Sequence, residues 1–136
     1  MGSNKIKHFQ PIKEEIETIG KACLDAAFKV HTNLGPGLLE SVYERALLYE
    51  LQKAGLFVEN QKILPITYDK IQLESSLRID ILVENCVIME LKATENMIPL
   101  YEAQLLTYLK LSNIRLGYLI NFNVLHLKDG IKRIVV

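Results

Sequence analysis

One segment, Leu77 to Lys92, restricts the fold of this chain more than any other. Its sequence, LRIDILVENCVIMELK, consists of two mostly apolar runs with a turn expected at Glu84-Asn85. Strands this apolar are normally buried, yet Asp80 lies in the first run and Glu90 and Lys92 lie in the second. Because charged groups are rarely buried without partners, the segment predicts a buried β-hairpin with a functional site at its end.

The register of this hairpin decides whether its two carboxylates meet. With a three-residue loop at 84–86, Val83 pairs with Val87 and Asp80 lies opposite Glu90. With a two-residue loop Asp80 falls on the other face, because a one-residue slip moves every side chain of the strand to the opposite face. We predict the three-residue loop, although such loops prefer glycine at the last position and this chain has a cysteine there.

In the predicted register the carboxylates of Asp80 and Glu90 lie roughly 5 Å apart at Cβ. Like charges at about 4 Å repel by roughly 4 kcal/mol at an effective dielectric of about 20. A raised pKa, the ammonium group of Lys92 or a bound cation would relieve this repulsion. Carboxylate oxygens suit Mg²⁺ or Mn²⁺, and Lys92 would then orient water or stabilise charge on phosphorus. The alternative is an ordinary exposed strand, since a Glu-x-Lys triplet alone is a weak signal.

Apolar periodicity places the remaining elements around the hairpin. The predicted helices are 12–31, 38–54 and 99–111, and the predicted strands are 57–59, 63–68, 71–73, 115–121, 124–128 and 131–136. Asp129-Gly130 predicts a type I′ turn between the last two strands. The order of the elements predicts an α/β sandwich on a mixed sheet, with the third helix as a crossover connection.

Composition limits the class of protein. The chain has 136 residues, 49% of them apolar and 24% charged, and a formal net charge of zero. We expect a flexible segment at 1–11 and one globular domain at 12–136. No apolar run reaches the roughly 20 residues that span a bilayer, and the two cysteines lack metal-binding spacing. We therefore expect a cytoplasmic protein without a membrane partner, whose neutral charge excludes a wholly basic surface but leaves room for a local basic groove.

The helices contribute three further candidates for the site. Glu40 lies in the first turn of the predicted second helix, where the helix dipole would stabilise a carboxylate by about 0.3–1 kcal/mol. Residue chemistry alone favours that explanation over a carboxylate directed at a metal ion. Gln104 and Tyr108 are four residues apart on the predicted third helix and share a face. Gln104 is either a solvated neighbour of a half-buried aromatic residue or a residue that binds water or a substrate phosphate.

Asp80 followed by Glu90-Leu91-Lys92 resembles the active-site signature of the PD-(D/E)xK nuclease superfamily. The run from Gly37 to Tyr43, GLLESVY, resembles the signature of the GxxExxY family, which is grouped with that superfamily. Gln104 with Tyr108 resembles the Q-x-x-x-Y element of RecB-type nucleases. The likeness extends from about residue 16 to residue 136 and departs from the superfamily label at residue 79, which is isoleucine where the label has proline.

This resemblance implies a restriction-endonuclease-like core, a mixed β-sheet flanked by helices with the site at one edge. The metal ligands that it implies are Asp80, Glu90 and the carbonyl group of Leu91, with Mg²⁺ or Mn²⁺ as the ion. The catalytic residues that it implies are Lys92, Glu40 and Gln104, and the substrate-binding residues are Tyr108 and Tyr43.

Two functions are predicted on this basis. The first is a Mg²⁺-dependent nuclease that hydrolyses phosphodiester bonds in DNA or RNA, with Asp80 and Glu90 as the metal ligands. The second is a catalytically idle module of the same fold that binds nucleic acid or protein and could act as a homodimer. The first is the leading hypothesis, because one predicted hairpin carries both carboxylates and the lysine. The neutral charge and the short chain, in which we expect no separate recognition domain, support the second.

Overall fold

The computed structural model describes residues 10–136, and the side chains of all of these except 75 and 76. Most of the segment predicted to be flexible, 1–11, therefore lies outside the described residues. The elements in chain order are α1 (Glu14–Leu34), α2 (Glu40–Lys53), β1 (Val58–Tyr68), β2 (Ile71–Val83), β3 (Val87–Lys92), α3 (Pro99–Ser112), β4 (Leu116–Asn121), the short 3₁₀ helix η2 (Leu127–Gly130) and β5 (Ile131–Val135). The three predicted helices are present, with ends shifted by no more than three residues.

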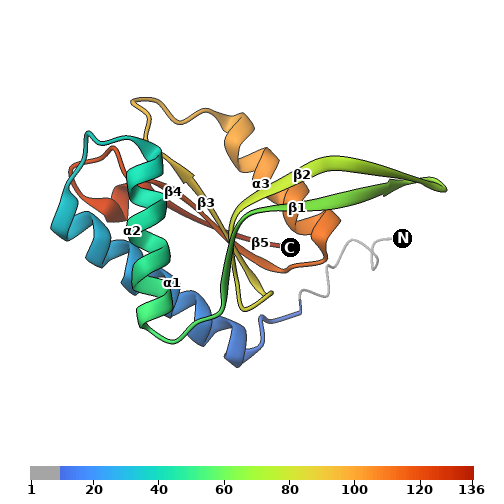
Figure 1. Ribbon diagram of the computed structural model, residues 1–136, viewed down its shortest axis with the longest axis horizontal. Helices are drawn as coiled ribbons and strands as arrows, with labels where there is room; N and C mark the ends of the chain where they lie inside the picture. Colours follow the sequence, from blue (N-terminus) through green and yellow to red (C-terminus); the bar gives the residue numbers. More distant parts are fainter. Residues whose placement is uncertain (1–9) are drawn as a thin grey trace, which may run out of the picture.

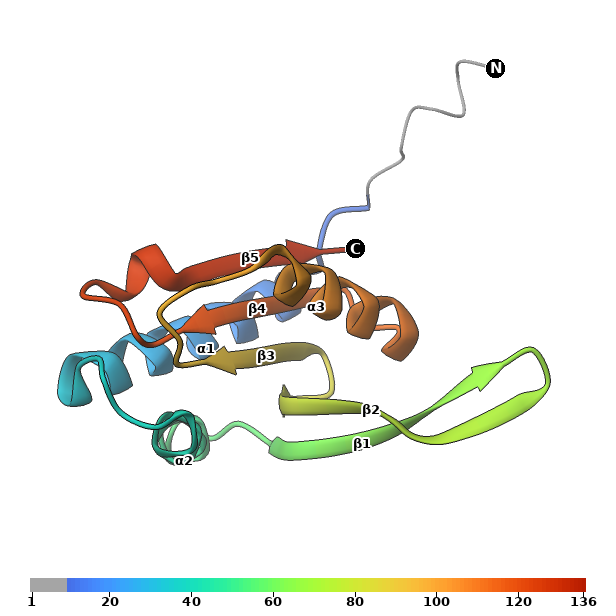
Figure 2. The same cartoon turned by 90° about the horizontal axis from the view of Figure 1, so that it is seen from above.

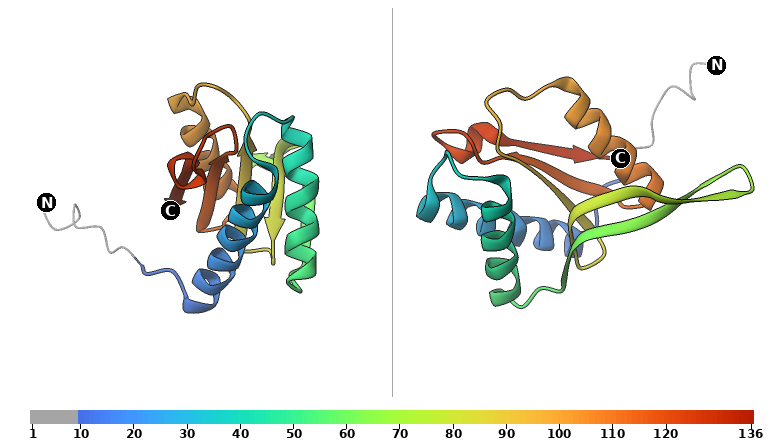
Figure 3. Two further views of the ribbon diagram at one scale, coloured as in Figure 1. Left: turned by 90° about the vertical axis from the view of Figure 1, so that its left-hand side faces the viewer. Right: turned by 45° about the horizontal axis from the view of Figure 1, so that its top comes forward.

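The strands form one mixed sheet in the order β1-β2-β3-β4-β5. The β3–β4 pair is parallel and the other pairs are antiparallel. The chain connects β3 to β4 through α3, which packs against one face of the sheet, while α1 and α2 cover the other (Figure 1; Figure 3, left). The predicted α/β sandwich on a mixed sheet, with the third helix as its crossover, is confirmed.

The sheet separates two apolar cores. The core beneath α1 and α2 includes Cys23, Ala27, Tyr43, Leu47, Ile81, Met89 and Leu91. The core beneath α3 includes Ile79, Ile88, Leu105, Leu109 and Leu119. Burial of each large apolar side chain stabilises the fold by about 1.5–3 kcal/mol. Along β3, Met89 and Leu91 face the first core and Ile88 faces the second, so alternation directs Glu90 and Lys92 toward the α3 side.

The β1–β2 hairpin is longer than predicted, because the sequence shows only short apolar runs in this region. Its turn lies at Asp69 and Lys70 as expected, and Asp69 has a φ of 57°. The strand register shifts between Leu64 and Ile66, at a proline that cannot donate a hydrogen bond to the ladder. Beyond that point the two strands extend past the rest of the sheet as an arm (Figure 2). The sequence predicted two short strands in place of β1, because polar residues such as Gln61 separate its apolar runs.

The predicted strand at 124–128 and the hairpin turn at Asp129-Gly130 are wrong. Residues 127–130 form a 3₁₀ helix, and β5 pairs directly with β4. A type I′ turn needs positive φ at both central residues, and neither Asp129 nor Gly130 has one. Gly130 is instead required because a Cβ atom at this position would collide with the backbone carbonyl of Asn121.

None of the helices within residues 10–136 has both the length and the apolar character that crossing a bilayer requires.

Candidate active site

The β2–β3 hairpin has the register in which the two carboxylates meet. Val83 pairs with Val87 and Ile81 with Met89, around a turn at 84–86. Glu84 and the asparagine after it have positive φ values of 50° and 53°, whereas the cysteine at 86 does not. Glycine is therefore not needed at the last loop position, and the predicted three-residue loop is confirmed.

Asp80 and Glu90 follow directly beyond the last regular pair of this ladder. Counting on from Ile81 and Met89 in the antiparallel register places them opposite each other. The Asp80 amide donates a hydrogen bond to Glu90 Oε1 at 3.0 Å, and the Leu91 amide donates one to Asp80 Oδ2 at 2.9 Å. Only 7% of Asp80 and 5% of Glu90 is exposed. Two buried carboxylates thus face each other where side chains replace the backbone ladder.

The pair carries an electrostatic strain that a proton or a cation relieves. Burial raises the pKa of Glu90 to about 8, and the negative charge of Asp80 contributes to the rise. The backbone amide of Asp80 and the ammonium group of Lys92 act in the opposite direction. At neutral pH Glu90 therefore keeps its proton unless another positive charge takes its place.

Glu40 brings a third carboxylate to the hairpin from the first residue of α2. Burial raises the pKa of Glu40, the charge of Asp80 raises it further, and Lys92 lowers it. Glu40 therefore lies within electrostatic range of the hairpin, although the three carboxylates are not grouped closely enough to hold a metal ion together. The structure therefore brings together the helix-borne carboxylate and the hairpin that the sequence placed 40 residues later.

Tyr43 holds the loop that precedes Glu40. Its hydroxyl donates to the Gly35 carbonyl at 2.6 Å and accepts from the Leu38 amide at 3.1 Å, and its ring stacks on Phe122 with centroids 4.6 Å apart. Tyr43 has no exposed surface, so it cannot contact a substrate in this conformation. The prediction that it binds substrate is corrected: its place in the fold is that of a support for the start of α2.

Lys92 is held against an aromatic ring that the sequence did not single out. Its Nζ lies 4.1 Å from the ring centroid of Tyr101, a cation–π contact. The charge of Lys92 lowers the pKa of both Glu40 and Glu90, so its ammonium group stabilises the ionised form of both carboxylates. The spacing along α3 could have grouped Tyr101 with Gln104, because the two are three residues apart on one face of the helix, but it could not have shown the contact with Lys92.

Tyr108 and Gln104 occupy this face of α3 as well. Burial raises the pKa of Tyr108, and the charge of Glu90 is the next largest cause, which places the Tyr108 hydroxyl near the carboxylate pair. Gln104 is exposed, and within residues 10–136 its amide forms no hydrogen bond. Helical geometry puts it in one row with Tyr101 and Tyr108, so it faces the same side, and its role stays a prediction.

Sequence reasoning missed Arg78. It lies two residues before Asp80 on β2, and its side chain is exposed between the buried Leu77 and Ile79. Its charge lowers the pKa of Glu40 and of Tyr108. Its position, two residues before Asp80 in an otherwise apolar run, could have identified it.

The carboxylate pair fits a hard divalent cation. Within the described residues no group of three His, Cys, Asp or Glu side chains is placed to hold a metal ion. Each carboxylate of Asp80 and Glu90, however, uses one oxygen for a backbone amide, and the pair lacks the positive charge that its burial requires. Oxygen ligands of this kind suit Mg²⁺ or Mn²⁺. The structure shows the Leu91 amide bonded to Asp80, and ligation by the Leu91 carbonyl stays a prediction.

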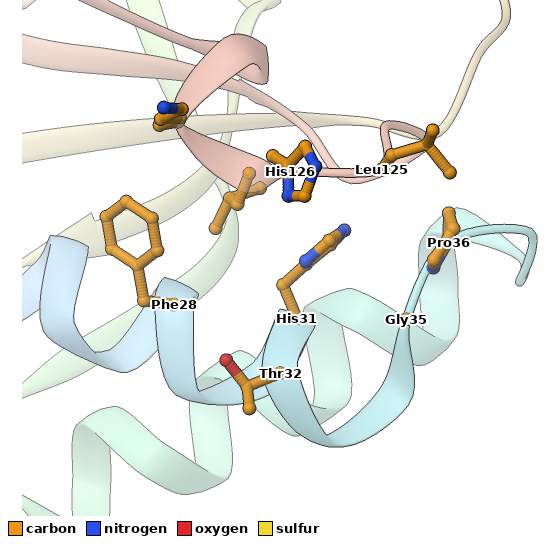
Figure 4. A pocket seen from close by; sticks show the side chains of 9 residues that line it. Phe28, His31, Thr32, Gly35, Pro36, Leu125 and His126 are labelled. Carbon is orange, nitrogen blue, oxygen red and sulfur yellow. The ribbon is translucent and has the colours of Figure 1, made fainter.

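A cavity of about 500 Å³ lies away from this hairpin, between the end of α1 and the loop around η2 (Figure 4). His31, Pro36, Leu125 and His126 are among the residues that line it. The ring of His31 is fixed there, with Nε2 2.8 Å from the Val124 carbonyl oxygen. Neither the carboxylates of the hairpin nor Lys92 line this cavity, so the candidate active site is the surface around the hairpin.

A mixed sheet between helices, with opposed carboxylates and a lysine on its central hairpin, defines an α/β protein with a restriction-endonuclease-like fold. The sequence profile of the PD-(D/E)XK nuclease superfamily matches residues 17–134, and the chain belongs to this superfamily. Nucleases of this superfamily generally use divalent metal ions and act on nucleic acid. Searches of curated proteins and of solved structures gave no match.

Proposed function

We propose that this protein is a metal-dependent nuclease that hydrolyses phosphodiester bonds in DNA or RNA. The observation that carries the proposal is the buried pair of Asp80 and Glu90, joined by crossed hydrogen bonds beside Lys92. A protein that only folds gains nothing from the two negative charges, because asparagine and glutamine side chains would accept the same backbone hydrogen bonds without the repulsion. A site that binds a cation and a phosphate explains why both are present.

In the proposed site Asp80 and Glu90 hold Mg²⁺ or Mn²⁺, with the Leu91 carbonyl as a further ligand. The bound ion supplies electrostatic stabilisation of the charge that develops on the phosphate oxygens. Lys92, steadied by the ring of Tyr101, orients the water that attacks phosphorus and donates hydrogen bonds to the phosphate as the P–O bond to the leaving oxygen breaks.

The helices complete the proposed site. Glu40 accepts a hydrogen bond from the water shell of the site, and Gln104 and Tyr108 contact the substrate from α3. The raised pKa of Tyr108 keeps its hydroxyl protonated and able to donate to a phosphate oxygen. We also propose that the chain belongs to the GxxExxY group of the superfamily. The support for this is the Tyr43 hydroxyl, which fixes the glycine-containing loop from which Glu40 extends.

Cleavage assays with purified protein test the proposal. We expect cleavage of DNA or RNA with Mg²⁺ or Mn²⁺, abolished by EDTA and lowered by orders of magnitude in Glu90→Gln and Lys92→Ala. Lys110→Ala, an exposed lysine on α3, is the matched control and should cleave like the wild type. If the site variants cleave as well as the wild type, the activity comes from a contaminant. Absence of cleavage and of metal binding in a folded protein would favour the idle module.

A further inference from the structure

Strands β2 and β3 stop pairing at the candidate active site. Their ladder runs from Val83 and Val87 to Ile81 and Met89 and ends there, whereas β3 stays paired with β4 as far as Lys92. Beyond this point the described part of β2 pairs with β1 alone and continues into the projecting arm (Figure 2). The two strands therefore separate from each other at Asp80 and Glu90.

A basic residue lies two positions from each carboxylate on these separating strands. Arg78 lies two residues before Asp80 on β2, and Lys92 lies two residues after Glu90 on β3. Within residues 10–136 neither cation forms an ion pair. Two cations without an ion-pair partner therefore flank the carboxylate pair, one on each strand.

A hydrogen bond places residue 78 beside the candidate site, because the Tyr108 hydroxyl of α3 bonds to the backbone of Arg78. The charge of Arg78 lowers the pKa of Glu40 and of Tyr108, and the charge of Asp80 raises both. The guanidinium of Arg78 and the carboxylate of Asp80 therefore act on the same two groups, one on α2 and one on α3. The burial of Leu77 and Ile79 on either side leaves only the arginine exposed there.

We propose that Arg78 is a substrate-binding residue that holds a phosphate next to the one that reacts beside Lys92. This inference rests on the proposed nuclease function and deepens it. Two residues along a strand cover roughly 6.6 Å, so Arg78 lies one such step beyond Asp80. Its planar guanidinium, with five donors, matches the oxygens of a phosphate group. The substrate class is then a nucleic-acid strand with consecutive phosphates, rather than an isolated phosphodiester.

Binding measurements test this role without catalysis. Fluorescence anisotropy would follow single-stranded DNA and RNA oligonucleotides of one sequence in EDTA, over a range of salt concentrations. Loss of one phosphate contact to a single strand should lower the slope of log K against log salt by about 0.7 in Arg78→Ala, with binding weaker by roughly 3–30-fold at low salt. Arg78→Lys should restore the slope, and Arg45→Ala, an exposed arginine on α2, should match the wild type.

Cleavage kinetics separate this proposal from the nuclease function itself. Arg78→Ala should raise KM for the oligonucleotide and leave the hydrolysis of bis(p-nitrophenyl) phosphate, which has a single phosphate, unchanged. An unchanged salt slope, equal losses on both substrates, or wild-type protein that binds neither oligonucleotide would overturn the role of Arg78. If the salt slope depends on Arg78 while the wild type cleaves nothing, the nuclease function fails and the phosphate contact stands.

Discussion

Asp80 and Glu90 are joined by crossed hydrogen bonds: the Asp80 amide donates to the Glu90 carboxylate, and the Asp80 carboxylate accepts from the amide that follows Glu90. Both side chains therefore serve the backbone and are at the same time candidate metal ligands. Their burial makes the stability of the hairpin sensitive to pH and to cations.

Glu90→Gln should stabilise the metal-free protein in neutral and alkaline solution. The pKa of Glu90 rises from an ordinary value of 4.5 to about 8 on folding. Between these values the folded state binds a proton that the unfolded state lacks, so the contribution of Glu90 to stability falls as pH rises through this window. Glutamine keeps the acceptor for the Asp80 amide and removes the charge. We expect a gain on the order of a few kcal/mol above the window, since one pKa unit corresponds to about 1.4 kcal/mol.

Thermal unfolding with EDTA across this pH range would measure the effect. The wild-type melting temperature should decline toward alkaline pH, and that of Glu90→Gln should decline less. If the melting temperatures of the two proteins changed equally with pH, the burial of a strained carboxylate pair would be contradicted.

Binding of Mg²⁺ or Mn²⁺ should release a proton at neutral pH. The proton on Glu90 must leave when a cation takes its place, so we expect about one proton per ion. Above the pKa of Glu90 the release should vanish and the affinity should rise. Calorimetry in buffers with different ionisation enthalpies measures this number. Heat signals that are independent of the buffer at neutral pH would show that the ion does not displace this proton.

Tyr43→Phe should weaken both the fold and the site. The variant loses the hydrogen bonds to the Gly35 carbonyl and the Leu38 amide, and each bond contributes about 0.5–1.5 kcal/mol to stability. The loop before Glu40 then becomes less fixed, and we expect nuclease activity to fall several-fold. Urea unfolding and cleavage assays measure the two effects. Tyr49→Phe is the control, because Tyr49 is 61% exposed on the same helix.

Replacement of the ring under Lys92 should affect catalysis more than stability. Tyr101→Leu removes the cation–π contact, worth about 0.5–2 kcal/mol, and frees the ammonium group to adopt other positions. We expect kcat to drop while the melting temperature changes by only a few degrees. Tyr101→Phe keeps the ring and should retain most of the activity. Equal losses in both variants would indicate that the Tyr101 hydroxyl, and not the ring, acts on the site.

The hairpin could be predicted from the sequence because its determinants are local. The two mostly apolar runs identified both strands, and the choice of a three-residue loop set Asp80 opposite Glu90. The failed prediction at Asp129-Gly130 has a tertiary cause. That glycine is required by the close approach of the Asn121 carbonyl, which the sequence around it does not reveal.

The remaining site residues depend on contacts between elements far apart in the chain. Residue chemistry alone favoured a dipole-stabilised Glu40, and only the packing of α2 against the sheet brings it near Asp80 and Lys92. The contact of Lys92 with Tyr101 follows from the path of α3 across the sheet, which no local pattern specifies. Tyr43 matches a family signature, yet its side chain is buried in the core. A sequence signature does not distinguish a residue that supports the fold from one that contacts the substrate.

The crossed hydrogen bonds have an evolutionary consequence. A buried backbone amide left without an acceptor costs about 1–3 kcal/mol, so folding alone would select for acidic or amide side chains at positions 80 and 90. A descendant that had lost catalysis would be expected to keep them. Within the described residues the side chains of Lys92 and Arg78 form no such hydrogen bond with the backbone. In related sequences, therefore, inheritance of the two cations would distinguish working enzymes from retired ones better than inheritance of the carboxylates.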